Sequence, residues 1–291
     1  MYELEQLGAS TYVIRSPANM GVFVVGDSAY LIDSGNDKEA GKKVLRHLEQ
    51  QGWRLEAVFN THANADHIGG NKLLRERTGC ALYASGVEAA FTQWPVLEPS
   101  FLYGGFPPKA LRSKFFMAQP SEAQPLTEAI LPEGLTAFPL PGHFFDMVGF
   151  RTADGVCFLA DCLFGMPTLE KYHISFFYDV AAALETLDAV EAMEAALFVP
   201  AHSEPTSDIR PLVAANRAKM LEIAALLREL CTEPRGSEEL LRLLFDHYGL
   251  SLDWSQYVLV GSTLRSYLTF LLERGELEAI FDQNRLLWRR I

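Results

Sequence analysis

Short apolar runs separated by turns that contain glycine or aspartate dominate the first two hundred residues of the chain. Runs of four to six residues bounded in this way are typical of strands, and longer stretches of helical periodicity separate them. The predicted strands cover 12–16, 22–25, 29–33, 55–60, 135–140, 148–151, 156–160 and 197–200. The predicted helices cover 37–51, 69–77 and 180–196. The pattern predicts an α/β (α+β) protein.

The pattern becomes helical beyond residue 211. Helices are predicted over 212–230, from 237 onward and over 258–274, and a hairpin over 277–288 that turns at 282–284. Ser237-Glu238-Glu239-Leu240 is similar to a capping box at a helix start. Helices followed by a two-stranded wing resemble a winged-helix domain. We therefore expect a main domain over 1–210 and a small helical, winged-helix-like module over 211–291.

Charge and composition narrow the classes of partner. The chain has 291 residues, 49% of them hydrophobic, which suffices for a sizeable core. The net charge of -12 argues against affinity for phosphate backbones or anionic membranes. From residue 231 to the end there are seven arginines and no lysine against nine acidic residues. We therefore expect the C-terminal module to pack against the main domain, support a lid or form a homodimer, and we do not expect it to bind nucleic acid.

Localisation is predicted from three further features. The first residues are acidic where a secretory signal would be basic. No apolar run approaches the roughly 20 residues that span a bilayer. Cys80, Cys157, Cys162 and Cys231 show no paired spacing, which favours reduced thiols. These features predict a cytoplasmic protein without a membrane partner.

The segment after the apolar run 57–59 contains the strongest chemical signal. His62, Asn64, Asp66 and His67 lie within six positions. Imidazole nitrogen and carboxylate oxygen are ligands of zinc and iron. Residues 62 and 64 can point one way while residues 66 and 67 point another. One loop, here called the metal loop (residues 60–71), could therefore hold two neighbouring ions.

Three further candidate ligands follow later apolar runs: His143, Asp161 and His202. Together with the metal loop they resemble the pattern of the metallo-β-lactamase superfamily, which is His-x-His-x-Asp-His followed by a His, an Asp and a His. The metal motif is similar to that of glyoxalase II, with one departure. Asn64 stands where the family usually has its second histidine. Asp33, at another predicted strand end, is expected to accept hydrogen bonds from the metal loop rather than to bind metal.

The resemblance implies a four-layer αββα sandwich and two adjoining metal sites. Site one would comprise His62, His143 and a bridging Asp161. Site two would comprise Asp66, His67, His202 and the same Asp161. Asn64 would be an oxygen ligand of site one or would hold a water there. Because an amide oxygen is a weaker ligand than imidazole, we expect site one to bind metal more loosely.

The same resemblance implies metal-assisted hydrolysis with one or two zinc ions, and iron or manganese remain open. Asp66 would orient the attacking water, and His62 and His143 would act as general acid or base if only site two is filled. The fold does not choose a substrate. A small ester, thioester or lactone is expected.

Two segments are candidates for contact with the substrate. Residues 85–134 form an insertion rich in aromatic residues and proline, which is expected to be a lid over the site. Lys171, Tyr172 and His173 follow Asp161 by about ten positions and could bind a substrate carboxylate or an oxyanion.

Two other classes of function remain open at this point. An iron-dependent redox enzyme of the same fold would act on oxygen, nitric oxide or persulfide. A non-catalytic or RNA-associated binding protein would need no metal. Substituting His67→Ala separates the classes, because an enzyme would lose activity while a scaffold would keep its partner.

Overall fold

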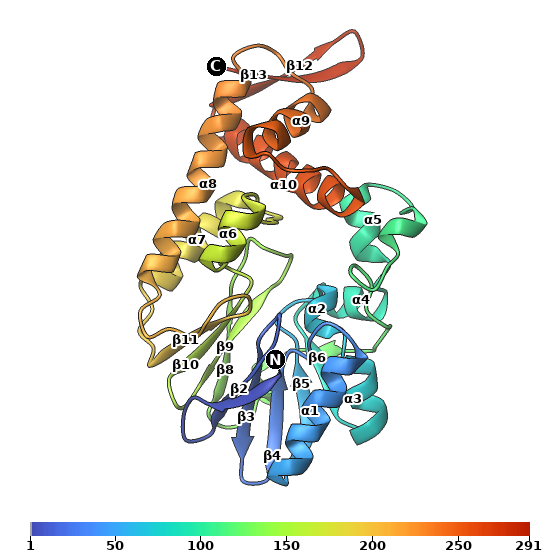
Figure 1. Ribbon diagram of the computed structural model, residues 1–291, viewed down its shortest axis with the longest axis vertical. Helices are drawn as coiled ribbons and strands as arrows, with labels where there is room; N and C mark the ends of the chain where they lie inside the picture. The colour runs from blue at the N-terminus through green and yellow to red at the C-terminus, as the bar shows by residue number, and fades with distance from the viewer. Residues whose placement is uncertain (1) are drawn as a thin grey trace.

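The computed structural model describes residues 2–291, in which two β-sheets face each other and helices cover both outer faces (Figure 1). The larger sheet is antiparallel from its first to its fourth strand and parallel beyond. Its seven strands are, in spatial order, β1 (Glu3–Gln6), β2 (Thr11–Arg15), β3 (Met20–Val25), β4 (Ser28–Ile32), β5 (Arg54–Phe59), β6 (Ala81–Ala84) and β7 (Gln124–Pro125).

The smaller sheet has four strands in the order β11 (Leu197–Pro200), β10 (Val156–Ala160), β9 (Val148–Thr152) and β8 (Leu135–Pro139). The pair β10 and β11 is parallel, and the other pairs are antiparallel. As a result, β4, β5, β8, β10 and β11 all end at the same side of the sandwich. The loops that follow β5, β8, β10 and β11 carry the candidate metal ligands, and the loop after β4 carries Asp33.

Helices occupy the outer layers and the chain end. The first group is α1 (Lys38–Gln51), α2 (Ala65–Ile68), α3 (Asn71–Thr78), α4 (Glu88–Gln93), α5 (Leu97–Tyr103), η1 (Lys109–Leu111) and η2 (Glu128–Ile130). The second group is α6 (Met166–Tyr172), α7 (Val180–Glu191), α8 (Arg210–Leu230), α9 (Ser237–Tyr248) and α10 (Trp254–Glu273). The hairpin of β12 (Leu277–Asp282) and β13 (Arg285–Arg290) follows α10.

Successive side chains along a strand point alternately toward the other sheet and toward the outer helices. In β10, Val156 and Phe158 face the other sheet, while Cys157 and Leu159 face the helices. In β3, Phe23 faces the other sheet, and Met20 and Val22 face α1 and α3. Because both faces of these strands are buried, their sequences are continuous apolar runs. The expected αββα sandwich is confirmed.

Most of the expected elements are present, and three details differ. A helix was expected over 180–196, but α7 ends at Glu191, because the chain must rejoin the sheet, where the Ala196 amide donates to the Gly155 carbonyl at 2.9 Å. The short α2 forms within the metal loop. Ser237 does not cap α9, because Gly236 is the N-cap and Ser237 is the first helical residue; its hydroxyl accepts from the Trp288 indole at 3.2 Å.

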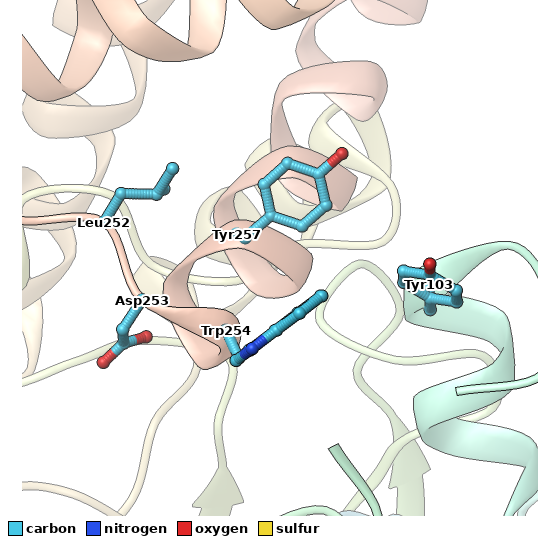
Figure 2. Close-up of a pocket in the computed structure, with 5 residues that line it drawn as sticks. All are labelled: Tyr103, Leu252, Asp253, Trp254 and Tyr257. Carbon is cyan, nitrogen blue, oxygen red and sulfur yellow. The ribbon is translucent and has the colours of Figure 1, made fainter. Parts of the chain in front are cut away.

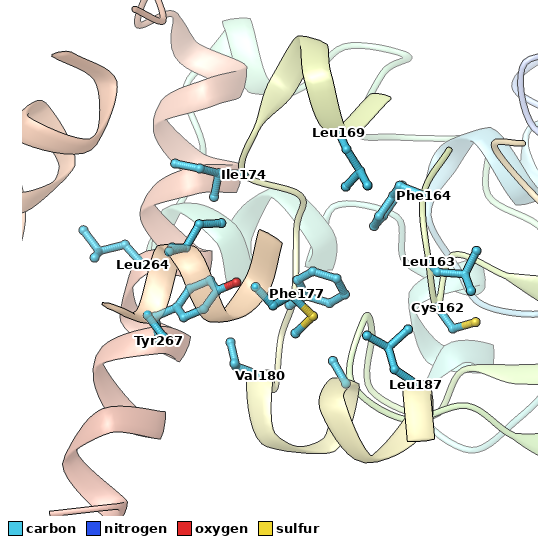
Figure 3. Packing of buried hydrophobic residues seen from close by; sticks show 14 of the residues in the cluster. Cys162, Leu163, Phe164, Leu169, Ile174, Phe177, Val180, Leu187, Leu264 and Tyr267 are labelled. Atoms are coloured by element: carbon cyan, nitrogen blue, oxygen red, sulfur yellow. The ribbon is translucent and has the colours of Figure 1, made fainter. Parts of the chain in front are cut away.

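The C-terminal helices share a core with the smaller sheet. One buried cluster runs from β10 and α7 through α8 to α9 and α10, and includes Phe177 and Tyr267 (Figure 3). Helix α10 also reaches α5 of the insertion (Figure 1). Val258 of α10 packs there with Leu102 of α5. No helix in residues 2–291 is long and apolar enough to cross a membrane.

A surface pocket of about 500 Å³ lies where α5 approaches the start of α10. Its lining residues are Tyr103, Leu252, Asp253, Trp254 and Tyr257 (Figure 2). None of them belongs to the candidate metal ligands, so this pocket is separate from the metal loop.

Asn216 ties α8 to the loop that follows Asp161. Its side-chain oxygen accepts from the Phe164 amide and its nitrogen donates to the Phe164 carbonyl, both at 2.9 Å. Asn216→Leu should lower the free energy of unfolding by about 2–4 kcal/mol, because both buried backbone groups lose their partner. Urea unfolding followed by circular dichroism measures this. The neighbouring Arg217→Ala, which removes exposed ion pairs, should cost at most about 1 kcal/mol. Equal losses in the two variants would contradict this role for Asn216.

Candidate metal centre

The Asp33 carboxylate organises the metal loop from the end of β4. It is 2% exposed, and its Oδ1 accepts from the Thr61 amide at 2.8 Å. Its Oδ2 accepts from the Thr61 hydroxyl at 2.8 Å and from His67 Nδ1 at 2.7 Å. Asp33 has a left-handed backbone with φ of 61°. The structural role expected for Asp33 is confirmed.

The outer nitrogen of each candidate histidine faces a hydrogen-bond acceptor. Nδ1 of His143 lies 3.0 Å from the Phe176 carbonyl, and Nδ1 of His202 lies 2.7 Å from the Pro17 carbonyl. Nδ1 of His62 lies 3.0 Å from the Thr61 hydroxyl, whose proton is already donated to Asp33. In the neutral rings, Nδ1 therefore carries the proton and Nε2 offers a lone pair.

The Nε2 atoms converge on two carboxylates. Asp161 lies 3.2 Å from Nε2 of His67, 3.2 Å from Nε2 of His202 and 3.8 Å from Nε2 of His143. Asp66 lies 3.4 Å from Nε2 of His202. The ligand atoms form two adjacent groups, His62 with His143 and Asp161, and Asp66 with His67 and His202. These six residues are called the histidine–aspartate cluster below.

Unpartnered buried atoms show that the cluster fits a metal. His62 Nε2, His67 Nε2 and Asp161 Oδ1 are buried and form no well-oriented hydrogen bond among the described residues, although the last two atoms lie 3.2 Å apart. Such groups are costly unless a ligand satisfies them. Imidazole nitrogens and carboxylate oxygens in this proportion suit zinc and neighbouring transition ions. Their positions next to Asp161 allow this carboxylate to serve both groups.

Burial and charge shift the cluster's pKa values in opposite directions. Burial lowers the pKa of His62 well below its ordinary value, and the nearby His67 acts the same way. Burial also lowers the pKa of His143. At His67 and His202 burial again acts to lower the pKa, but Asp161 and the other nearby carboxylates outweigh it and raise the pKa well above its ordinary value. In the metal-free cluster, burial therefore favours the neutral form of His62 and His143, and the nearby carboxylates favour the protonated form of His67 and His202.

Backbone contacts from distant segments hold the loops together. The Val148 amide, at the start of β9, donates to the Thr61 carbonyl at 2.9 Å. Asn19 donates through Nδ2 to the carbonyls of Pro200 at 2.9 Å and Ser203 at 2.7 Å. Ala160, directly before Asp161, has a left-handed φ of 49° at an irregularity in the pairing of β10 and β11. The smaller sheet thus supports the metal loop through Val148, and a loop of the larger sheet supports the loop of His202 through Asn19.

Two buried glutamates of the insertion contact the metal loop, and the sequence did not single them out. Glu88, with no exposed surface, accepts from the amides of Ala63 and Asp146, both at 2.9 Å, and burial raises its pKa to about 7. Glu98 accepts from Asn64 Nδ2 at 2.9 Å, and burial together with Asp66 raises its pKa well above its ordinary value. The sequence could have identified them, because they are the only acidic residues between 85 and 121 in a segment that is otherwise rich in aromatic residues and proline.

Asn64 contacts the cluster, whereas the contacts of residues 171–173 are with each other and with α9. Asn64 Oδ1 lies 3.0 Å from His143 Nε2. The Lys171 amine donates to the Tyr172 hydroxyl at 2.9 Å, and both side chains are exposed. The His173 ring stacks on Tyr248 of α9 with centroids 4.7 Å apart. Among residues 2–291, none of these three has a hydrogen bond or ion pair with the histidine–aspartate cluster.

Comparison with known proteins agrees with this geometry. The sequence model of the family described as the metallo-beta-lactamase superfamily matches residues 13–202. This range includes all six residues of the histidine–aspartate cluster, the whole smaller sheet and the larger sheet except β1 and the start of β2. The chain belongs to the metallo-β-lactamase superfamily.

Relatives of known activity match only a short part of the chain. The hydroxyacylglutathione hydrolase of Gloeobacter violaceus is 43% identical over 65 residues, which are 22% of this chain and 26% of that protein. The hydroxyacylglutathione hydrolase of Methylococcus capsulatus is 46% identical over 46 residues, which are 16% of this chain and 18% of that protein. The chain thus spans about a quarter or less of the length of these curated relatives.

Solved structures show the likeness of the whole fold. A beta-lactamase domain protein from Burkholderia ambifaria has a TM-score of 0.80 at 20% identity, with 99% of this chain and 94% of that chain covered. A metallo-beta-lactamase family protein from Thermus thermophilus has a TM-score of 0.73 at 18% identity, with coverages of 99% and 98%. The shared fold therefore includes the C-terminal helices as well as the sandwich.

Asp33→Asn should weaken Zn²⁺ binding about 10- to 100-fold, because an amide cannot accept from both Thr61 groups and from His67 Nδ1. Competition with a chromophoric chelator measures the affinity. Asp37→Asn is the matched control, since it lies close in sequence but caps α1, where asparagine caps equally well. Unchanged affinity in Asp33→Asn would contradict the orienting role of Asp33.

Zn²⁺ binding should release protons and strengthen as pH rises. His67 and His202 have raised pKa values, so both carry protons below those values and lose them as pH increases. A ligating Nε2 must be deprotonated, so each displaced proton strengthens binding by up to about tenfold per pH unit. Calorimetric titration in buffers of different ionisation enthalpy counts the protons. Binding without proton release near neutral pH would show that the rings are already neutral.

Proposed function

We propose that the chain is a metal-dependent hydrolase of a small ester, thioester or lactone. One observation carries this proposal: four imidazole Nε2 atoms, each fixed by an acceptor at Nδ1, converge with the carboxylates of Asp66 and Asp161. Membership of the superfamily supports a hydrolytic centre. The local similarity to hydroxyacylglutathione hydrolases favours thioesters among the candidate substrates.

The ligand groups divide between two adjacent sites. Site two would be held by Asp66, His67 and His202, with Asp161 shared. Site one would be held by His62, His143 and Asp161, with Asn64 beside them. Zinc suits this nitrogen and carboxylate set best, and the weaker donor at residue 64 favours filling of site two first.

When bound, a divalent ion of this kind lowers the pKa of a water and polarises the scissile carbonyl. Asp66 is the most exposed carboxylate of the cluster, with 40% of its side chain accessible. The pKa of Asp66 is lowered, since His67 and His202 outweigh its burial, so the group is anionic and can accept a hydrogen bond that orients the attacking water. His62 and His143, kept neutral by burial, can accept a proton when site one is not filled.

Aromatic side chains next to His143 favour an apolar acyl group in the substrate. The Phe176 ring lies 5.3 Å from the His143 ring, centroid to centroid. Phe145 stacks on Tyr178 at 4.3 Å, and Phe101 of α5 contacts both, at 5.1 Å and 5.7 Å. Tyr178 is 40% exposed, so this aromatic surface is accessible to a ligand. It supports the role of residues 85–134 as a lid.

The proposal is tested by elemental analysis and hydrolysis assays on protein purified without added metal. Zinc at one or two atoms per chain and hydrolysis of an acyl thioester, ester or lactone are the expected results. A hydroxyacylglutathione, an apolar acyl thioester and a lactone should be compared. His67→Ala should lower kcat/KM by at least about 1,000-fold, because it removes a site-two ligand. His47→Ala, which removes a histidine of α1 bonded to the Tyr2 carbonyl, should leave it unchanged.

Other outcomes would favour the other classes of function. Iron as the native metal, without hydrolysis, would favour a redox enzyme. Absence of bound metal under every loading condition, with full folding and no hydrolysis, would favour a binding protein. Hydrolysis that survives in His67→Ala would place the activity outside the histidine–aspartate cluster.

A further inference from the structure

Asn64 is the position where this chain departs from the family pattern, and its amide is held at both ends. Oδ1 lies 3.0 Å from Nε2 of His143, and Nδ2 donates to Glu98 Oε1 at 2.9 Å. Glu98 comes from α5 of the insertion and is 5% exposed. A buried carboxyl group at this place needs a polar partner, and the Asn64 amide supplies one.

The hydrogen bond to Glu98 decides which way the amide faces. An amide has a donor end and an acceptor end, whereas Oε1 of Glu98 keeps a lone pair whether or not Oε2 carries a proton. With Nδ2 turned to Glu98, the amide oxygen is turned to His143. In its neutral form the His143 ring also presents a lone pair at Nε2, because Nδ1 faces the Phe176 carbonyl. Two lone-pair atoms 3.0 Å apart are the arrangement of two ligands that share a cation.

We propose that Asn64 is an oxygen ligand of site one and that Glu98 is the positioning residue that turns its amide oxygen toward the ion. Three side chains would then surround site one besides Asn64, namely His62, His143 and Asp161. The missing imidazole of the family pattern is thus replaced by a pair of residues, one from the metal loop and one from the insertion. This inference rests on the proposed metal centre.

The position of Glu98 depends on how α5, which carries it, packs against the C-terminal helices. Four residues after Glu98, Leu102 is 3% exposed and packs with Leu111, Phe116 and Val258 of α10. Helix α10 in turn shares a core with α7, α8 and α9. The C-terminal helices therefore hold the insertion against the metal loop, and the hydrogen bond of Glu98 reaches the site-one side of this loop through Asn64.

The experiment is a titration of metal-free protein with Zn²⁺ alone, read by calorimetry. Wild type should bind two ions in two steps, the second weaker. Glu98→Leu should weaken the second step about 10- to 100-fold and leave the first unchanged. Glu98→Gln, which keeps an acceptor oxygen, should restore the second step. Co²⁺ absorption spectra of the same variants should show the change in the second ion only.

A double-mutant cycle separates positioning from general damage to the lid. Asn64→Ala should lose the second step as Glu98→Leu does, and the double variant should lose no more than either single variant. Melting temperatures show that each variant is folded. The inference is overturned if wild type binds one ion at saturation, if Glu98→Leu leaves the second step unchanged, or if the two losses add.

The role of Glu98 and the hydrolase activity can each fail their test while the other passes. Wild type that hydrolyses a substrate while Glu98→Leu keeps its second step would overturn the role of Glu98 and leave the hydrolase standing. Wild type that hydrolyses no substrate while the variants lose the second step would overturn the hydrolase and leave the role of Glu98 standing.

Discussion

The hydrogen bonds of the buried Asp33 carboxylate are the constraint on which the rest of the site depends. Three donors converge on this group from the Thr61 amide, the Thr61 hydroxyl and His67 Nδ1. Through Thr61 the same carboxylate also sets the ring of His62. One side chain therefore fixes the backbone of the metal loop and the proton positions of a histidine in each ligand group. The left-handed backbone of Asp33 is tolerated because these bonds stabilise it.

The two halves of the sandwich form the site together. Loops of the larger sheet supply His62, Asp66 and His67, and loops of the smaller sheet supply His143, Asp161 and His202. Bonds that cross between the halves, such as Val148 to Thr61 and Asn19 to Pro200, hold the two sets in register. The insertion and the C-terminal helices add a third support, which reaches Asn64 through Glu98. The insertion packs against the metal loop that carries ligands of both sites, and at site one it also contacts Asn64 directly.

Sequence patterns predicted the strands well because both faces of these strands are buried, which leaves continuous apolar runs. The patterns failed where a long-range contact overrides local preference. Helix α7 ends at Glu191 because Ala196 must join Gly155, although the sequence 192–196 is a good helix former. Ser237 was expected to cap α9, but Gly236 is the N-cap and the Ser237 hydroxyl accepts from the Trp288 indole. Lys171, Tyr172 and His173 were chosen by position along the chain and stay a prediction, with the His173 ring stacked on Tyr248 of α9.

The sequence by itself determined most of the strands and helices and the candidate ligands, because apolar runs, ligand type and ligand order are local properties of the chain. The layers and the two ligand groups were implied only by the family resemblance, and the structure brings six of these residues together as two adjacent groups. Only the tertiary structure decided that Asp33, the Phe176 carbonyl and the Pro17 carbonyl set the histidine tautomers. It also paired Asn64 with Glu98, residues 34 positions apart. These contacts join segments distant in the chain, and no periodicity or motif encodes which distant partner a buried polar group will find.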